Sequence, residues 1–311
     1  KVEFVDIDPK TYNISIEALK AKLKIAEAVG QLPKLIVPVH FAGQSCEMKE
    51  IWNLSKVYGF KVIEDASHAL GTKYTSGNER GTIGDCRHAA MTTFSFHPVK
   101  TITLAEGGAV STSDDTLDRR LRLFRNHGMT READSFTNAE MGFDAGGGPN
   151  PWYYEMAEPG YNYRLTDLQC ALGLSQLRKL DRFAAQRRLL AARYAELIGP
   201  LSPHVRLLTT SDRCEPVRHL AVVLIDFAAL GTNRARVMHQ LRAGGIGTQV
   251  HYIPVHKQPY YRNLYGELDL PGAEAYYERT LSLPLFAGME TSDVDRVVEI
   301  LSTTLGLDKN L

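Results

Sequence analysis

Short runs of branched apolar residues, separated by a helical pattern, constrain the fold of this chain more than any other feature of its sequence. Residues 34–39 and 60–63 are two such runs, and buried parallel strands have this composition. Between them, residues 46–58 place apolar side chains at helical spacing, and Gly59 follows as a stop signal. A strand, a helix and a strand in this order predict a βαβ unit with a right-handed crossover.

The next part of the chain continues this pattern and then interrupts it. We expect two more strands at residues 91–96 and 109–112, and a helix with one apolar face at residues 115–126. Residues 128–155 have little periodicity and contain a Gly-Gly-Gly-Pro sequence. This segment is therefore predicted to be a loop or a mobile flap.

A long helix follows the irregular segment, and the sequence pattern changes after Gly199. Residues 166–196 predict a long helical stretch with a break near residues 180–181. Beyond Gly199 we expect a smaller α+β unit built from a strand at 219–225, a helix at 233–242 and a strand at 248–252. The predicted fold class is α/β, with a large domain over residues 1–182 and a small C-terminal domain over residues 183–311.

Composition excludes several classes of protein. The 311 residues include 36 Lys+Arg and 36 Asp+Glu, so neither a nucleic-acid surface nor a polybasic membrane surface is expected. No apolar run is long enough to span a bilayer, and no signal peptide is recognised. Four scattered cysteines without a CxxC pair fit free thiols in a reducing cytoplasm better than disulfides or a metal site.

The first residues read as if the chain began inside a sheet. The sequence starts at Lys1 without a methionine, and residues 2–7 already have the composition of a strand. Natural chains seldom begin in this way. We therefore expect that upstream residues are missing from this sequence.

A carboxylate follows the second predicted strand directly. Asp65 comes after Ile63 and Glu64, and ligands of open α/β sheets bind at the carboxyl ends of strands. A carboxylate there could hold the protonated ring nitrogen of a cofactor. An aspartate that caps the next turn is the commoner meaning of such a position when it is taken alone.

A serine and a lysine follow the third strand in the same way. The Ser95 hydroxyl and the amides of a turn could bind phosphate. Lys100, five residues later, could form an imine with a carbonyl carbon if burial or a nearby cation keeps its amine partly neutral. Most lysines are simply solvated.

Two histidines lie close to these residues in sequence. His68 and His97 could each contact an aromatic cofactor, or each could be a hydrogen-bonded core histidine. Neither has a spacing to another histidine or cysteine that is typical of metal ligands. We therefore predict no metal site.

Five motifs in register resemble the DegT/DnrJ/EryC1/StrS sugar aminotransferase family, and the resemblance extends over the whole chain. The matching residues are 64–71 (EDASHALG), 94–100 (FSFHPVK), 105–109 (AEGGA), 125–128 (RNHG), and 161–164 (YNYR) with 167–169 (DLQ). The resemblance implies the fold of pyridoxal-phosphate (PLP)-dependent transferases of fold type I, with a mixed sheet in the large domain. Family members carry a long segment before the equivalent of Val2, with a phosphate-binding loop and a ring-stacking aromatic residue.

The resemblance implies a role for each residue that matches a family motif. Lys100 corresponds to the lysine that holds PLP as a Schiff base and later moves the proton. Asp65 corresponds to the acid at the pyridine nitrogen, His68 to the residue beside the ring, and Ser95 to the phosphate-binding serine. Asn162 corresponds to an asparagine that reaches the cofactor phosphate of the neighbouring subunit, which implies a homodimer with shared active sites.

Part of the small domain resembles the surface that faces the sugar nucleotide in the family. It supplies candidate substrate residues His251, Tyr252, His256 and Tyr260. Their rings could stack on, or form hydrogen bonds with, the base and sugar. Arg164 could bind the carboxylate of the amino donor or the diphosphate.

The substrate is predicted from the branch of the family that the chain resembles. Residues 39–45, 67–71 and 171–177 resemble the pseudaminic acid branch, which implies transfer from L-glutamate to C4 of a UDP-linked 4-keto-6-deoxy-N-acetyl sugar. The branch that makes UDP-4-amino-4-deoxy-arabinose also carries histidine at position 68 and is an alternative, as are other nucleotide-sugar aminotransferases. A non-catalytic PLP-fold binding protein is a further alternative, whereas Lys100 argues against the sugar dehydratases of this fold, which carry histidine there.

Overall fold

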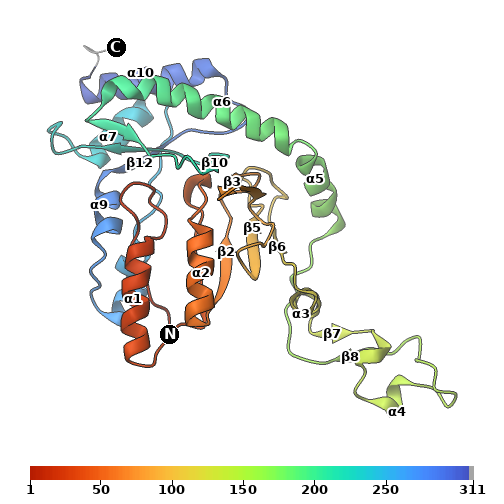
Figure 1. Ribbon diagram of the computed structural model, residues 1–311. Coiled ribbons are helices and arrows are strands. Elements are labelled where there is room, and N and C mark those ends of the chain that lie inside the picture. The colour runs from red at the N-terminus through yellow and green to blue at the C-terminus, as the bar shows by residue number, and fades with distance from the viewer. Residues whose placement is uncertain (308–311) are drawn as a thin grey trace.

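The computed structural model describes residues 1–307, and a four-stranded mixed sheet forms the centre of its N-terminal part (Figure 1). The strands lie in the order β1-β2-β5-β6; the first three are parallel, and β6 is antiparallel to β5. The predicted α/β fold with a mixed sheet is therefore confirmed. The bounds of the strands are β1 (Leu35–Ile36), β2 (Lys61–Asp65), β5 (Met91–Ser95) and β6 (Gly108–Ser111).

Two helices cover one face of this sheet. Helix α2 (Met48–Tyr58) connects β1 to β2 and ends at Gly59, whose φ of 77° lies in the left-handed region that suits glycine. The predicted βαβ unit is therefore present. Helix α1 (Ile16–Ala28) packs beside α2 through Leu19 and Leu23. It was not predicted, because only these two side chains of the helix are buried.

The predicted strand at residues 2–7 is not present. Within these residues only Ile7 takes part in β pairing, in an isolated bridge to Ile14, which belongs to no strand. The segment runs instead along the C-terminal part of the molecule, where the Asp6 carboxylate accepts hydrogen bonds of 2.8 and 2.9 Å from two amides at the start of α9 (Pro271–Arg279). Contacts far away in sequence therefore decide the conformation of these residues.

A second small sheet joins the two halves of the chain. The hairpin of β3 (Lys73–Ser76) and β4 (Glu79–Thr82) pairs through β3 with β10 (Cys214–Glu215), which comes from the C-terminal part. Directly after β10, the Val217 amide donates to the Thr72 hydroxyl at 3.0 Å. The large and small domains predicted from the sequence are therefore in close contact around residues 214–217.

A three-stranded antiparallel sheet, in the order β12-β11-β9, forms the core of the C-terminal part. All five residues of β11 are buried, and α6 and α10 cover one face of the sheet (Figure 1). The predicted strand at 219–225 and helix at 233–242 correspond to β11 and α7. The bounds are α6 (Leu180–Ile198), β9 (Val205–Leu207), β11 (Ala221–Ile225), α7 (Arg234–Ala243), α8 (Pro259–Tyr265), β12 (Thr280–Leu283) and α10 (Thr291–Leu305).

The predicted strand at residues 248–252 is wrong. Gln249 alone forms a bridge to Ser282, and the chain then leaves the sheet. The Tyr276 hydroxyl donates to the carbonyl of His251 at 2.6 Å and holds the segment in an irregular conformation. The sequence predicted a strand, but the contacts of His251 with Tyr276 and Ser282 hold this segment outside the sheet.

The long helical stretch is broken where the sequence predicted. Helix α5 (Asp167–Leu177) and α6 are separated by two residues. Thr166 begins α5 with a capping box, in which its hydroxyl accepts from the Gln169 amide and the Gln169 side chain accepts from the Thr166 amide.

Residues 126–163 form an arm that projects away from both sheets (Figure 1). Helix α3 leads into the arm, and two very short antiparallel strands pair across it. Most of the predicted loop at 128–155 is irregular, as expected. Trp152 is 74% exposed and Tyr163 is 70% exposed, so large aromatic side chains lie on its surface. The bounds are α3 (Asp115–Arg125), β7 (Met129–Thr130), α4 (Ala139–Gly142) and β8 (Glu155–Met156).

Candidate active site

Asp65, at the end of β2, has its main-chain amide and carbonyl both held by the segment that follows β1. Its amide donates to the Pro38 carbonyl at 2.9 Å, and its carbonyl accepts from the His40 amide at 3.0 Å. One carboxylate oxygen accepts from the Ser67 amide at 2.9 Å, which is the turn-capping contact considered from the sequence. Among residues 1–307 no other hydrogen-bond donor reaches this carboxylate, so it retains acceptor capacity for a ligand.

Lys100 is half-buried beyond the end of β5. Burial lowers the pKa of its amine, and the nearby charge of Asp65 partly opposes that shift. Burial disfavours the ammonium form, so the amine is more nucleophilic than that of a solvated lysine. The structure thus brings Lys100 and Asp65, which come from neighbouring strands, into one electrostatic environment.

Ser95 and Lys100 are linked by a tight turn. The Lys100 amide donates to the carbonyl of His97 at 2.9 Å, and the His97 amide donates to the Ser95 hydroxyl at 3.5 Å. The imidazole of His97 lies at the surface, 3.8 Å from Glu106. Of the two histidines singled out from the sequence, His97 therefore faces away from the buried group around Asp65.

His68 is buried, and both of its ring nitrogens have partners. The Ala42 amide donates to Nδ1 at 3.4 Å, so we assign the proton to Nε2, which lies 3.2 Å from the Tyr252 hydroxyl. Burial, with the charge of Lys100 as the second cause, lowers the pKa of His68 to about 3. His68 is therefore a neutral hydrogen-bonding group at physiological pH.

Tyr252 belongs to the C-terminal part, so the site is built from both halves of the chain. The rings of Tyr252 and His68 are stacked, and their centroids are 6.1 Å apart. The preceding residue is fixed by two contacts, since His251 Nδ1 lies 2.9 Å from the Ser282 hydroxyl and its carbonyl accepts from Tyr276. Burial, followed by the charge of Lys100, lowers the pKa of His251.

A third histidine of this group was missed by the sequence analysis. His219 is 5% exposed, and its ring centroid lies 4.5 Å from that of His68. Burial lowers its pKa to about 2. Its amide donates to the Ala42 carbonyl, and its carbonyl accepts from buried Arg187. The only sequence signal was a polar residue before the apolar strand β11.

The remaining candidates lie outside this buried group. Asn162 is exposed on the arm, where its side chain accepts from Arg164 at 3.4 Å. His256 is buried against Glu274, with Nε2 3.4 Å from the carboxylate. Tyr260 is exposed, and its ring packs edge-on against Tyr261. The structure therefore unites Asp65, His68, Lys100 and Tyr252, but not these four residues.

Two further findings concern the described residues as a whole. No helix within residues 1–307 is long and apolar enough to cross a membrane. No group of three or more His, Cys, Asp or Glu side chains in the same range is arranged to hold a metal ion.

The sheet and the group at its carboxyl edge define a PLP-dependent transferase of fold type I. The chain belongs to the DegT/DnrJ/EryC1/StrS aminotransferase family, whose family model matches residues 1–302. It is a sugar aminotransferase with PLP as its cofactor.

Individual relatives agree with this class. The spore coat polysaccharide biosynthesis protein SpsC of Bacillus subtilis is 38% identical over 305 residues, which are 95% of this chain and 71% of SpsC. The structure of Helicobacter pylori PseC, an aminotransferase involved in the biosynthesis of pseudaminic acid, matches with a TM-score of 0.83 and 29% identity over 98% of this chain and 73% of PseC. The PLP form of Spr1654, a sugar aminotransferase from Streptococcus pneumoniae, matches with a TM-score of 0.79 and 25% identity over 99% of this chain and 75% of Spr1654.

Proposed function

We propose that this protein transfers the amino group of L-glutamate to C4 of a UDP-linked 4-keto-6-deoxy-N-acetyl sugar. This is the reaction of the UDP-4-amino-4,6-dideoxy-N-acetyl-β-L-altrosamine transaminase of pseudaminic acid biosynthesis. The observation that carries the chemistry is the half-buried Lys100 amine in the field of Asp65. The likeness to PseC supports the choice of sugar.

The donor set around Lys100 fits PLP. Asp65 offers a carboxylate with unused acceptor capacity to the pyridine nitrogen, and Lys100 offers a partly desolvated amine to the aldehyde carbon. Ser95 and the amides of the turn that follows it offer hydrogen bonds to the phosphate. His68 offers a buried, uncharged ring beside the cofactor.

Different residues of this chain have different roles in the reaction. When bound, PLP supplies the electron sink for the reacting carbon. The Asp65 carboxylate holds a proton at the pyridine nitrogen through a charge-assisted hydrogen bond. The Lys100 amine would hold the cofactor and would take and return the proton at the substrate carbon. His68, as a neutral donor to Tyr252, adds no positive charge beside Lys100.

We propose that residues around the arm contact the partner subunit and that residues of the small domain contact the substrate. Asn162 on the arm and Arg164 directly after it are exposed, which suits residues that complete the site of a second subunit in a homodimer. Tyr252 is the substrate candidate in direct contact with the buried group; His251, His256 and Tyr260 are proposed to line the sugar-nucleotide side. The free cysteines suit a reducing cytoplasm, where we place the enzyme.

The substrate assignment is tested by comparing three 4-keto-sugar nucleotides. We expect the highest kcat/KM with the UDP-linked N-acetyl-4-keto sugar of L-arabino configuration, lower values with its D-xylo epimer, and the lowest with UDP-4-keto-arabinose, because hydrogen bonds to particular hydroxyls reject epimers. A preference of about tenfold or more for the arabinose substrate, equivalent to about 1.4 kcal/mol, would assign the protein to the arabinose branch. Absence of turnover with every sugar and glutamate would favour a non-catalytic binding protein.

A further inference from the structure

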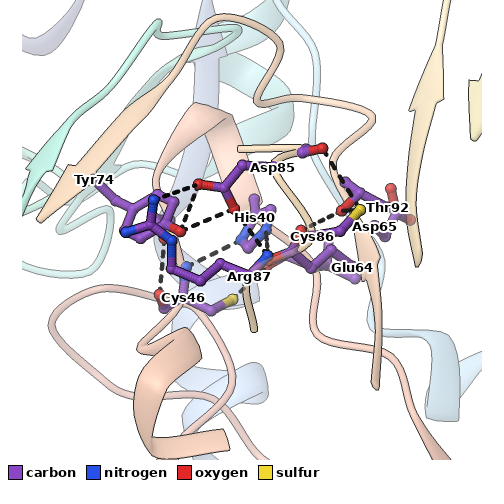
Figure 2. A network of polar contacts seen from close by, with 12 residues as sticks. His40, Cys46, Glu64, Asp65, Tyr74, Asp85, Cys86, Arg87 and Thr92 are labelled. Atoms are coloured by element: carbon purple, nitrogen blue, oxygen red, sulfur yellow. Dashed lines mark hydrogen bonds and ion pairs between the residues drawn. The ribbon is translucent and has the colours of Figure 1, made fainter. Parts of the chain in front are cut away.

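A buried polar pair lies on the face of β2 opposite Asp65 (Figure 2). His40 is 0% exposed and Glu64 is 4% exposed, and His40 Nε2 lies 3.6 Å from Glu64 Oε1. Side chains alternate along a strand, so Glu64 shares its face with buried Val62, whereas Asp65 lies on the other. A buried carboxylate and imidazole are costly unless they are paired, and the reaction assigned above uses neither.

The surroundings of the pair determine its orientation. The Cys46 amide donates to His40 Nδ1 at 3.1 Å, so Nε2 carries the ring proton and faces Glu64. On the other side, the Thr92 hydroxyl donates to Glu64 Oε2. Thr92 is the direct neighbour of Glu64 in the parallel register of β2 and β5. Figure 2 shows these side chains as one connected network.

The same residues hold the main chain of Asp65. The His40 amide donates to the Asp65 carbonyl at 3.0 Å, while the Thr93 hydroxyl donates to the Glu64 carbonyl at 3.1 Å. Strand β1 is only two residues long, so regular pairing stops before it reaches the level of Asp65. His40 extends that pairing. Its imidazole accepts a hydrogen bond from the Cys46 amide, and its Nε2 faces Glu64 Oε1 at 3.6 Å without forming a hydrogen bond.

We propose that His40 and Glu64 are positioning residues that keep the end of β2 in place, so that the Asp65 carboxylate meets the pyridine nitrogen of the cofactor. They act through the main chain and do not touch the cofactor themselves. This inference rests on the role proposed for Asp65. The competing explanation is that the pair only stabilises the core.

The test measures the state of the pyridine nitrogen in the holoenzyme and not only its activity. ¹⁵N-labelled PLP is bound to each variant, the ¹⁵N chemical shift reports protonation of the ring, and titration of the apoprotein gives the Kd of PLP. His40→Asn keeps an oxygen for the Cys46 amide but is too short to reach Glu64. We expect a smaller protonated fraction of the pyridine nitrogen and a Kd of PLP about tenfold higher. This is the lower end of the effect seen at metal sites when a residue that holds a metal ligand is removed. His40→Gln, whose amide reaches further, should recover most of both losses.

Three more variants make the outcome decisive. Glu64→Gln keeps the shape of the side chain if His40→Asn fails to fold, and it should change the ¹⁵N shift in the same direction. Tyr74→Phe removes the partly buried hydrogen bonds from the Tyr74 hydroxyl to the Asp85 carboxylate, outside the pair of His40 and Glu64, and should lower Tm while leaving the ¹⁵N shift unchanged. If the His40 and Glu64 variants behave like Tyr74→Phe, the pair is only structural and the inference is wrong. If Asp65→Asn leaves the ¹⁵N shift unchanged, the proposed role of Asp65 fails, and this inference fails with it.

Discussion

The site residues at the edge of the sheet and those around the arm differ in how exposed they are. Asp65 and Lys100 lie at the edge of the sheet beside buried His68, and burial lowers the pKa of both Lys100 and His68. Asn162 on the projecting arm and Arg164 directly after it are exposed, and the Arg164 side chain donates a hydrogen bond to that of Asn162. The chemistry can therefore be derived from the geometry of one chain, whereas the role of the arm depends on a second surface. Four experiments can break or sharpen this contrast.

Loss of the Lys100 amine should have the largest effect. In Lys100→Ala, turnover with glutamate and keto-sugar should fall below detection, because the amine proposed to hold the cofactor beside Asp65 is lost. Borohydride reduction of the wild-type enzyme should attach the cofactor to the peptide that contains Lys100, as read by mass spectrometry. Exposed Lys24 provides the control, and Lys24→Ala should keep wild-type turnover. Labelling of a different lysine would remove Lys100 from the centre of the site.

Removal of the Asp65 charge should have the next largest effect. Asp65→Asn keeps the hydrogen bond to the Ser67 amide but loses the charge that favours a protonated ring. We expect kcat to fall by about a hundredfold, as for other electrostatic stabilisers. Near-normal kcat would mean that the turn-capping contact is the whole role of Asp65.

The arm can be tested by complementation between two inactive chains. If Asn162 completes the site of the partner subunit, mixed Lys100→Ala and Asn162→Ala chains should recover about a quarter of wild-type turnover, because half of randomly paired dimers are mixed and each has one complete site. Subunit exchange is verified independently by mass spectrometry of differently tagged chains. Subunit exchange without recovery of turnover would mean that Asn162 does not complete the partner subunit's active site. The arm would then have no part in the site.

The smallest expected effect concerns stability at low pH. Burial holds the pKa of His68 at about 3 and that of His219 at about 2, below the value of about 6.5 in the unfolded chain. Below about pH 6.5 the unfolded state therefore binds more protons, and stability should fall as the pH decreases towards 3, by at most about 1.4 kcal/mol per pH unit for each histidine.

Substitution of one of these histidines separates its contribution. His219→Phe keeps a ring against His68 and should make Tm less steeply dependent on pH between about 6.5 and 3. Exposed His239 on α7 is the matched control, and His239→Phe should leave the slope unchanged. An equal slope in wild type and His219→Phe would show that His219 is more accessible to protons than its burial indicates.

The residues that carry the chemistry were predictable because their signals are local. The βαβ unit from β1 to β2, the stop at Gly59 and the break between α5 and α6 all follow from periodicity and terminal residues within short segments. Asp65 and Lys100 each follow a strand of the parallel sheet, and parallel strands bring their carboxyl ends to one edge. The motifs around them indicated the family, and the family model matches residues 1–302.

The tertiary structure alone decided how these residues are supported. No local pattern brings His219 to His68, places Tyr252 at its ring, or pairs His40 with Glu64. Residues 2–7 and 248–252 have strand-like sequences, but contacts with α9 and Tyr276 give them other conformations. Sequence patterns record which face of an element is buried, whereas contacts between distant segments depend on how the elements pack, and a short segment follows the stronger contact.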